Sequence, residues 1–360
     1  MKTRILRFFN SVGQGGFYTE TFWGDDGSRF VVVYDCGTET ADKDLDISLD
    51  HLIDMFAKKY SQIDVLFISH FHADHISGMN KLLSQTKVIK TVIPMLDIPT
   101  ITVTRVQNFL RFNSRLAQEA DSIIQDLYLG GEKTNRFGEV VMVSPESPDE
   151  PHKENEGDAP LLSNGNIIYS GSRINVKEIW EYIPFNSIER NDSRAQAVLN
   201  GLYALTDGKL TISDLLKYKL EEVKDVYRQA MNNANDNLYT LVVTSKPVDG
   251  IIAMPHPKLA PCIYFGDFDY RQKNKPWERL NEAINYAAIG TVQVPHHGAK
   301  GNWRTEMGDG NHRHYIVSTG STNGHHHPNY WVLREIAEKK HELFVVSEKL
   351  KTRKKYVYYV

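Results

Sequence analysis

Four side chains able to bind a metal ion fall within the stretch Ser-His-Phe-His-Ala-Asp-His at residues 69–75, namely His70, His72, Asp74 and His75. Imidazole nitrogens and a carboxylate oxygen together suit first-row divalent ions. A β-branched and aromatic run at residues 63–69 predicts a buried strand in front of the cluster. Apolar residues at helical spacing follow over 76–83. We therefore expect a metal site at a strand–turn–helix junction, against the alternative of surface residues brought together by accident.

The pattern His-x-His-x-Asp-His at this junction resembles the signature of the metallo-β-lactamase superfamily. The resemblance implies an α+β fold, a four-layer αββα sandwich that carries two metal ions between the edges of its sheets. It implies that His70 and His72 bind the first ion, and that Asp74 and His75 bind the second. Asp74 is also expected to take part in catalysis.

Further ligands are implied where two later apolar runs end. Asp267 closes the run at residues 263–267 and corresponds to the superfamily's bridging aspartate. His296 and His297 close the run at residues 292–297, and His296 is the better ligand candidate because it comes directly off the strand. His297 is expected to donate a hydrogen bond beside the ligands or to hold a leaving group, or else to be a simple turn residue. Asp35, after the run at 30–34, corresponds to the aspartate that braces the metal-binding histidines.

Within the superfamily, several short motifs are similar to the subgroup typified by the hydrolase domain of the bacterial DNA-uptake protein ComEC. They lie at residues 10–15, 237–243, 295–298, 318–320 and 327–328. The similarity covers roughly residues 1–100 and 236–335. Two features depart from this subgroup. The subgroup usually has an acidic residue after the position of Gly15, whereas Gly16 and Phe17 follow here. The superfamily's third-motif histidine, expected between His75 and Asp267, has no clear counterpart. Only His152 and His256 lie in the interval where that histidine is expected.

A pair of divalent ions, with Zn or Mn expected and iron also chemically acceptable, activates water and polarises a carbonyl or phosphoryl oxygen. A group is then needed to protonate the leaving oxygen. The run His325, His326 and His327 supplies candidates, and His327 is preferred because His-Pro recurs there in the resembling domain. The alternative for His327 is a solvated turn before a helix.

We expect a metal-dependent hydrolase. The resemblance to the ComEC-type hydrolase domain favours a phosphodiesterase or nuclease. Nucleic acid, an oligonucleotide or a cyclic nucleotide is the expected substrate. A lactone, thioester or other small acyl compound is the alternative, since the same ions would serve that chemistry. A binding module without catalysis is disfavoured because most ligand positions are filled.

The chain is expected to form one domain over residues 1–360, with an inserted helical segment or cap at 146–235. Residues 146–165 are rich in Pro, Glu, Asp and Asn and predict a loop. Strands are predicted at 3–10, 17–23, 28–34, 88–95 and 139–143, and helices at 48–60, 104–129, 211–234, 277–289 and 329–339. Cations and aromatic residues alternate within the insertion, which fits either a single-stranded nucleic-acid channel or ordinary amphipathic helices with solvated faces.

The composition indicates the cellular compartment of the protein but does not identify its substrate. The net charge of −3 gives no overall attraction to nucleic acid, although residues 348–355 are strongly basic. Two cysteines, Cys36 and Cys262, exclude a cysteine-rich zinc site and predict buried thiols, a Cys36–Cys262 bridge being the alternative. The start of the chain has no apolar signal region, and no apolar run is long enough to cross a bilayer. We therefore expect a cytoplasmic protein with no membrane partner.

Overall fold

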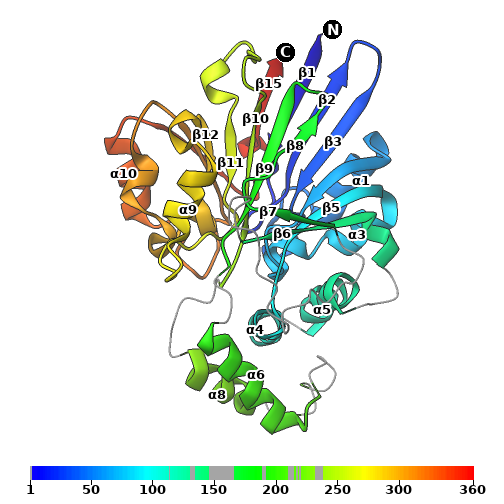
Figure 1. The fold of residues 1–360 in the computed structure, drawn as a ribbon, viewed down its shortest axis with the longest axis vertical. Coiled ribbons are helices and arrows are strands. Elements are labelled where there is room, and N and C mark those ends of the chain that lie inside the picture. The colour runs from blue at the N-terminus through cyan, green and yellow to red at the C-terminus, as the bar shows by residue number, and fades with distance from the viewer. Residues whose placement is uncertain are drawn as a thin grey trace.

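Two β-sheets face each other between layers of helices in the computed structural model of this chain (Figure 1). The structure describes residues 2–112, 114–129, 134–145, 166–188, 192–209, 215, 218, 220–231 and 238–360. The predicted αββα sandwich is confirmed.

The first sheet has eight strands in the order β15-β1-β2-β3-β4-β5-β6-β7. Neighbours are antiparallel from β15 to β3 and parallel from β3 to β7. The strands are β1 (Thr3–Phe9), β2 (Tyr18–Gly24), β3 (Arg29–Tyr34), β4 (Gln62–Phe67), β5 (Lys87–Pro94), β6 (Glu139–Ser144), β7 (Asn166–Tyr169) and β15 (Lys354–Tyr359).

The second sheet has seven strands in the order β14-β13-β12-β11-β10-β9-β8. Its strands β11 to β14 run parallel, so their carboxyl ends meet at one edge. The strands are β8 (Ile174–Val176), β9 (Trp180–Asn186), β10 (Leu241–Pro247), β11 (Cys262–Tyr264), β12 (Thr291–Gln293), β13 (His314–Ser318) and β14 (Glu342–Val346).

Three buried apolar clusters hold the layers together, one between the sheets and one under the helices on each outer face. Successive side chains of a strand point to opposite faces of its sheet, so each strand contributes both to the cluster between the sheets and to one outer cluster. The helices beside the first sheet are α1 (Leu49–Lys59), α3 (Met79–Gln85), α4 (Ile98–Arg111) and α5 (Ser114–Tyr128); those beside the second are α9 (Pro276–Ala283) and α10 (Tyr330–Glu338).

A buried ion pair on the first sheet accepts hydrogen bonds from the second sheet. Arg7 Nε on β1 donates to Glu20 Oε1 on β2 at 2.7 Å. From the opposite sheet, Tyr182 Oη donates to Glu20 Oε2 at 2.6 Å, and Tyr264 Oη donates to Glu20 Oε1 at 2.6 Å. Burial alone would raise the pKa of Glu20, but Arg7 and these hydroxyl donors more than offset it and hold that pKa below its usual 4.5. The carboxylate therefore stays ionised inside the sandwich.

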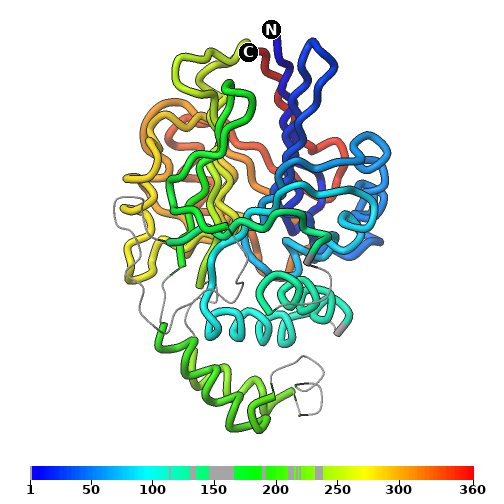
Figure 2. The backbone as a smooth tube through the Cα atoms, turned by 45° about the vertical axis from the view of Figure 1, so that its right-hand side comes forward, coloured from blue at the N-terminus to red at the C-terminus, as the bar shows by residue number. Residues whose placement is uncertain are grey.

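The segment expected as an insertion contributes to both sheets, because β7, β8 and β9 fall within residues 146–235. Among the described residues, its helical part is α6 (Ser193–Thr206) and α8 (Leu220–Met231). These two helices pack on each other and α6 packs on α4, beyond the edge of the sheets (Figure 2). The predicted loop at 146–165 lies outside the described residues.

Most predicted elements appear within a few residues of their expected bounds, and Ser48 caps α1 by accepting from His51 N at 3.2 Å. Two helices differ. The helix expected over 104–129 is divided into α4 and α5, because α4 begins earlier, at the Asp97 cap, and ends before Phe112. The helix expected over 277–289 ends at Ala283, followed by a short 3-10 turn. Among the helices that the structure describes, none is long and apolar enough to span a membrane.

Candidate metal centre

The loop after β4 places four potential metal ligands in a buried position at the edge of the first sheet. His70, His72, Asp74 and His75 are all buried, and Asp74 and His75 lie on the short helix α2 (Ala73–Ile76). Strand β3 runs parallel to β4 beside it and ends just before Asp35, which is also buried. The sequence Ser69–His75 therefore lies at a strand–turn–helix junction.

The second sheet supplies the remaining donors from its own edge. Asp267 follows β11, and His296 and His297 follow β12. His296, His297 and Gly298 all have positive φ, at 47°, 53° and 83°. This left-handed run is unfavourable for histidine. It turns the chain sharply enough for both imidazoles to lie beside the donors of the first sheet.

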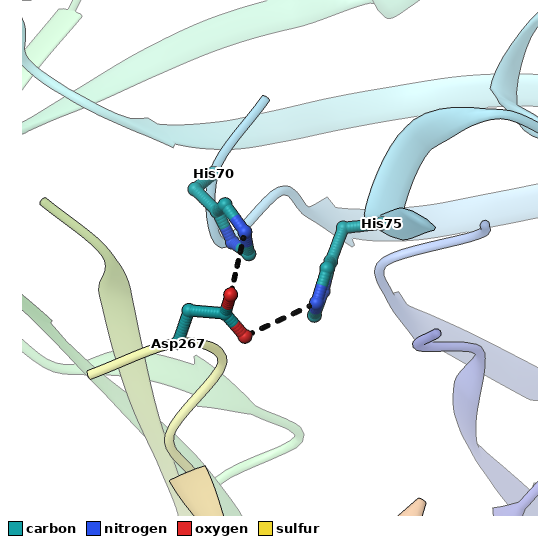
Figure 3. Close-up of side chains that lie close together, drawn as sticks. All are labelled: His70, His75 and Asp267. Carbon is teal, nitrogen blue, oxygen red and sulfur yellow. Dashed lines mark ion pairs between the residues drawn. The ribbon is translucent and has the colours of Figure 1, made fainter. Parts of the chain in front are cut away.

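Asp267 lies between two histidines of the first sheet (Figure 3). Its Oδ2 is 3.4 Å from His70 Nε2, and its Oδ1 is 3.3 Å from His75 Nε2. Asp74 Oδ2 lies 3.5 Å from His75 Nε2 and 3.1 Å from His297 Nε2. Residues about two hundred positions apart in the sequence thus converge on one buried cluster.

Within the described part of the chain, this cluster contains three overlapping groups of three residues. In each group, one donor atom from each residue lies within 4.8 Å of the other two. The groups are His70–His75–Asp267, His70–His72–Asp74 and Asp74–His75–His297. His296 lies 3.5 Å from Asp267 Oδ2 but belongs to none of these groups. The side chain of His296 is 24% exposed, whereas that of His297 is 3% exposed. The geometry therefore favours His297 over His296, because the double left-handed turn carries the second imidazole inward.

Each of the five imidazoles has one ring nitrogen held by an oxygen of the scaffold. Such contacts fix the orientation of a metal-binding histidine and select its tautomer. The pairs are His70 Nδ1 with Ser69 Oγ (2.9 Å), His72 Nε2 with Gln107 Oε1 (2.9 Å), His75 Nδ1 with Asp35 Oδ2 (2.8 Å), His296 Nδ1 with Asn302 Oδ1 (3.0 Å) and His297 Nδ1 with the Ser318 carbonyl (2.8 Å).

Asp35 organises both sides of the His-rich loop. Its Oδ1 accepts from Ser69 N at 2.7 Å, and its Oδ2 accepts from Ser69 Oγ at 2.7 Å. Because the Ser69 hydroxyl hydrogen is used on Asp35, Ser69 Oγ accepts from His70 Nδ1–H. In the neutral rings, the opposite nitrogens, Nε2 of His70 and of His75, then carry lone pairs toward Asp267.

The cluster suits a cation on electrostatic grounds. Three carboxylates, Asp35, Asp74 and Asp267, are buried together, which is costly without compensating positive charge. Burial alone would raise the pKa of Asp74 and of Asp267, but the adjacent histidines hold both pKa values below the usual range. Among the described residues, His70 Nε2 and His75 Nε2 are buried without a hydrogen-bond partner. Divalent metal ions fit this donor set, since they would satisfy these nitrogens and offset the carboxylate charge.

The histidines also differ in protonation, because their surroundings differ. Burial lowers the pKa of His72 to about 3, so this imidazole is neutral and can act as a ligand. Burial acts in the same direction on His75, but Asp74, Asp267 and Asp35 outweigh it and raise the pKa of His75 well above its usual value.

His327 lies at the rim of the cluster. Its ring centroid is 5.5 Å from that of His296. Burial and the neighbouring histidines lower the pKa of His327 to about 4, so the ring is neutral at neutral pH. His325 and His326 are exposed, and His325 Nε2 lies 3.4 Å from Glu39 Oε1. The structure therefore brings His327, but not His326, to the edge of the metal-capable groups.

Close packing against α2 explains why glycine stands at positions 15 and 37. An added Cβ at Gly15 would lie 2.7 Å from the Asp74 carbonyl oxygen, and one at Gly37 would lie 2.4 Å from the His75 carbonyl carbon. Both contacts are shorter than real Cβ contacts. The loops at residues 10–15 and 35–37 thus support the backbone that carries Asp74 and His75.

Sequence reasoning missed several residues that position the histidines. Gln107 on α4 contacts His72, while Asn302 contacts His296 and also donates to the Phe268 carbonyl at 2.8 Å. A lone glutamine inside a helix and an asparagine in a loop give no local signal. Of the two candidates for the third-motif histidine, His152 lies outside the described residues, and His256 is exposed in a groove away from this cluster.

Comparison with known proteins found one matching family model and several similar solved structures. The sequence profile of the Metallo-beta-lactamase superfamily matches residues 25–158. The fold is similar to the metallo-beta-lactamase fold protein YhfI from Bacillus subtilis, with 10% identity, 100% of each chain covered and a TM-score of 0.41. It is also similar to zinc-bound PqqB from Methylobacterium extorquens, with 8% identity, 94% and 97% covered and a TM-score of 0.40. A diphosphatase of the PhnP family has 9% identity, 99% and 98% covered and a TM-score of 0.39. No curated protein matches the sequence.

Proposed function

We infer from the match of residues 25–158 to the metallo-β-lactamase superfamily and from the histidine–aspartate cluster that this chain is a metal-dependent hydrolase, and we propose that it cleaves phosphodiesters. The observation that carries the first inference is the position of Asp267, whose two oxygens face His70 and His75 separately. One carboxylate between two sets of imidazoles is suited to a pair of ions.

The proposed ligands form two sets that share Asp267. His70 and His72 would hold the first ion, and Asp74, His75 and His297 would hold the second, with His296 at the margin of the first. Bound divalent ions, Zn or Mn, would activate water and act as Lewis acids on the substrate. The chain's own residues hold these donors in place, since each imidazole is fixed through its other nitrogen.

A cationic pocket beside the cluster supports an anionic substrate. The pocket has a volume of about 210 Å³ and lies between α4 and α8. Gln107, which contacts His72, lines it together with Arg111, Lys224 and Arg228. Guanidinium and ammonium groups are the usual partners of phosphate oxygens. Lys224 and Arg228 also contact acidic side chains on α8 itself, at 2.9 Å or more, in exposed pairs that contribute little.

We propose that His327 contacts the leaving group of the substrate. It comes from a turn between β13 and α10, and its ring packs edge to face against His296 at the rim rather than inside the buried donors. A neutral imidazole there can hydrogen-bond a phosphodiester oxygen without competing for the metal positions. The similarity to the ComEC-type hydrolase domain makes DNA or an oligonucleotide the first substrate to test.

The test offers metal-loaded protein a phosphodiester chromogen, linear DNA and short oligonucleotides with Zn²⁺ or Mn²⁺, and a thioester and a lactone in parallel. Cleavage of phosphodiesters should fall at least 100-fold in Asp267→Asn and in His72→Ala. The control His51→Ala, an exposed histidine on α1, should match wild type. Activity on acyl substrates alone would refute the phosphodiester proposal. Failure of the folded protein to bind metal or cleave any substrate would refute the hydrolase itself.

Loss of Arg111 tests the anionic pocket separately. Arg111→Ala should raise KM for the phosphodiester chromogen by about tenfold, because an interaction of about 1.4 kcal/mol with a phosphate is removed. The kcat value should change less than threefold. An unchanged KM would show that the pocket does not bind substrate.

A further inference from the structure

A second group of metal-capable side chains lies at the opposite end of the second sheet. His314 begins β13 and Glu342 begins β14, and these two residues are direct partners in the parallel register. His312 lies two residues before β13. The centre described above is at the carboxyl ends of the strands, so the two groups are separated by the length of the sheet.

Both histidines face the same carboxylate. His312 Nε2 is 3.5 Å from Glu342 Oε1, and His314 Nε2 is 3.4 Å from Glu342 Oε2. One donor atom from each of the three residues lies within 4.8 Å of the others. Two imidazoles and one carboxylate form a set that zinc sites with an open coordination position use.

The other ring nitrogens are already engaged, as expected for metal-binding histidines. His312 Nδ1 donates to the Lys340 carbonyl at 3.1 Å, which fixes the tautomer with a lone pair on Nε2. His314 Nδ1 lies 2.8 Å from the hydroxyl of Tyr356, a buried side chain on strand β15 of the facing sheet. The Tyr356 hydroxyl can accept from Nδ1–H and leave Nε2 available. A chance surface cluster would not need both supports.

The group opens into a large groove. The groove has a volume of about 880 Å³, and its lining includes His312, His314, Glu342, Lys354 and Lys355. The side chains of His312 and Glu342 are each about half exposed, at 53% and 54%, so an ion could enter directly from solvent. Lys354 Nζ is held 3.2 Å from the centroid of the Phe344 ring, and its charge would favour an anionic group at the open position.

We propose that His312, His314 and Glu342 form a second divalent-metal site, which takes a zinc-class ion and leaves a coordination position open to water or to a small anion such as phosphate. Imidazole and carboxylate donors select first-row transition ions over Ca²⁺ or Mg²⁺. The site does not depend on the function proposed for the buried centre.

The experiment titrates metal-stripped full-length protein with Zn²⁺ in competition with a chromogenic chelator and counts the bound equivalents. Glu342→Gln and His312→Ala should each remove one equivalent or weaken it by more than about 100-fold, because loss of a direct ligand should exceed the roughly 10- to 100-fold effect of losing a supporting group. Tyr356→Phe should weaken the same equivalent about tenfold. His256→Ala, which lines the same groove outside the ligand set, should behave as wild type.

The two metal sites are separable in this titration. Asp267→Asn should affect only the buried centre and leave the equivalent that depends on Glu342 in place. Circular dichroism of each variant shows that it is folded; His312 and Glu342 are exposed, so their replacement leaves the core intact. Equal zinc counts and affinities in wild type, Glu342→Gln and His312→Ala would overturn the proposal and leave an ordinary imidazolium–carboxylate pair.

Discussion

Replacing Asp35 with asparagine should weaken metal binding without removing any ligand. In wild type, Asp35 accepts hydrogen bonds from Ser69 N, Ser69 Oγ and His75 Nδ1. An asparagine whose oxygen faces Ser69 N keeps that bond, but its amino group then faces two donors. His75 must move its hydrogen to Nε2 to accept from the amide, and Nε2 is the atom that faces Asp267. The favourable tautomer for a ligand is therefore lost.

The size of the effect follows from these contacts. Removing the support of a metal-binding histidine typically costs about 10- to 100-fold in affinity, or about 1.4 to 2.7 kcal/mol. Metal stabilises the folded state by RT ln(1 + [M]/Kd), so at saturating metal this stabilisation should shrink by the same amount. The metal-free protein should lose less, because Asp35→Asn also removes one of three buried carboxylate charges.

The assay combines a chelator competition with urea unfolding in the presence and absence of Zn²⁺. Asp64→Asn is the matched control, because Asp64 Oδ2 accepts from Val31 N at 2.7 Å on the same sheet but outside the cluster. Asp64→Asn should change stability with and without metal equally. If Asp35→Asn bound Zn²⁺ as tightly as wild type, the argument that this carboxylate sets the tautomer of His75 would be refuted.

Three further variants test other parts of the structure. His297→Ala should lower zinc affinity more than His296→Ala, by at least tenfold in the same competition, because only His297 belongs to a metal-capable group; a larger effect of His296→Ala would reverse the assignment. Gly37→Ala should destabilise the protein by about 1 to 3 kcal/mol through overpacking and should weaken metal binding, whereas Gly324→Ala, with open space at its Cβ, should do neither in thermal unfolding and zinc titration. Glu20→Gln should cost about 3 to 5 kcal/mol at pH 7 in urea unfolding. Because the folded pKa of Glu20 lies below its unfolded value of 4.5, this stabilisation is complete above about pH 4.5 and declines as the pH falls below it, so a difference from wild type that grew on acidification would contradict the sign.

The sheets and the His-rich loop could be predicted because their sequence patterns are strong. Apart from Asp64, residues 63–67 are apolar, and the metal-capable residues follow this run directly. The helix beginning at Ser48 was equally clear, since a capping residue precedes a regular apolar stripe. Periodicity could not show that residues 104–129 span two helices, because the apolar spacing continues across the break at Phe112.

The choice between His296 and His297 lay beyond the sequence for a different reason. A residue that directly follows a strand normally continues its direction, which favours His296. Two consecutive left-handed histidines favour His297 in the proposed ligand set, and a histidine does not by itself predict such a conformation. The same holds for Gln107, whose role depends on how α4 packs over the loop rather than on its neighbours in the chain.

The sequence also did not show that residues 166–186 take part in both sheets. Residues 166–186 are joined to the sandwich by strand pairing with β6 and β10, which are distant from each other in sequence. The local sequence pattern of a strand does not predict which distant strand it pairs with.

The donors of the buried centre are divided between the two halves of the polypeptide. His70 to His75 come from the first sheet, and Asp267 and His297 come from the second. During synthesis, the early half leaves the ribosome with an incomplete set of proposed ligands, and His297 follows His75 by more than two hundred residues. With the proposed ligand set, full loading with metal would happen only after translation has passed residue 297, so that ion capture would be a late step that follows docking of the two halves.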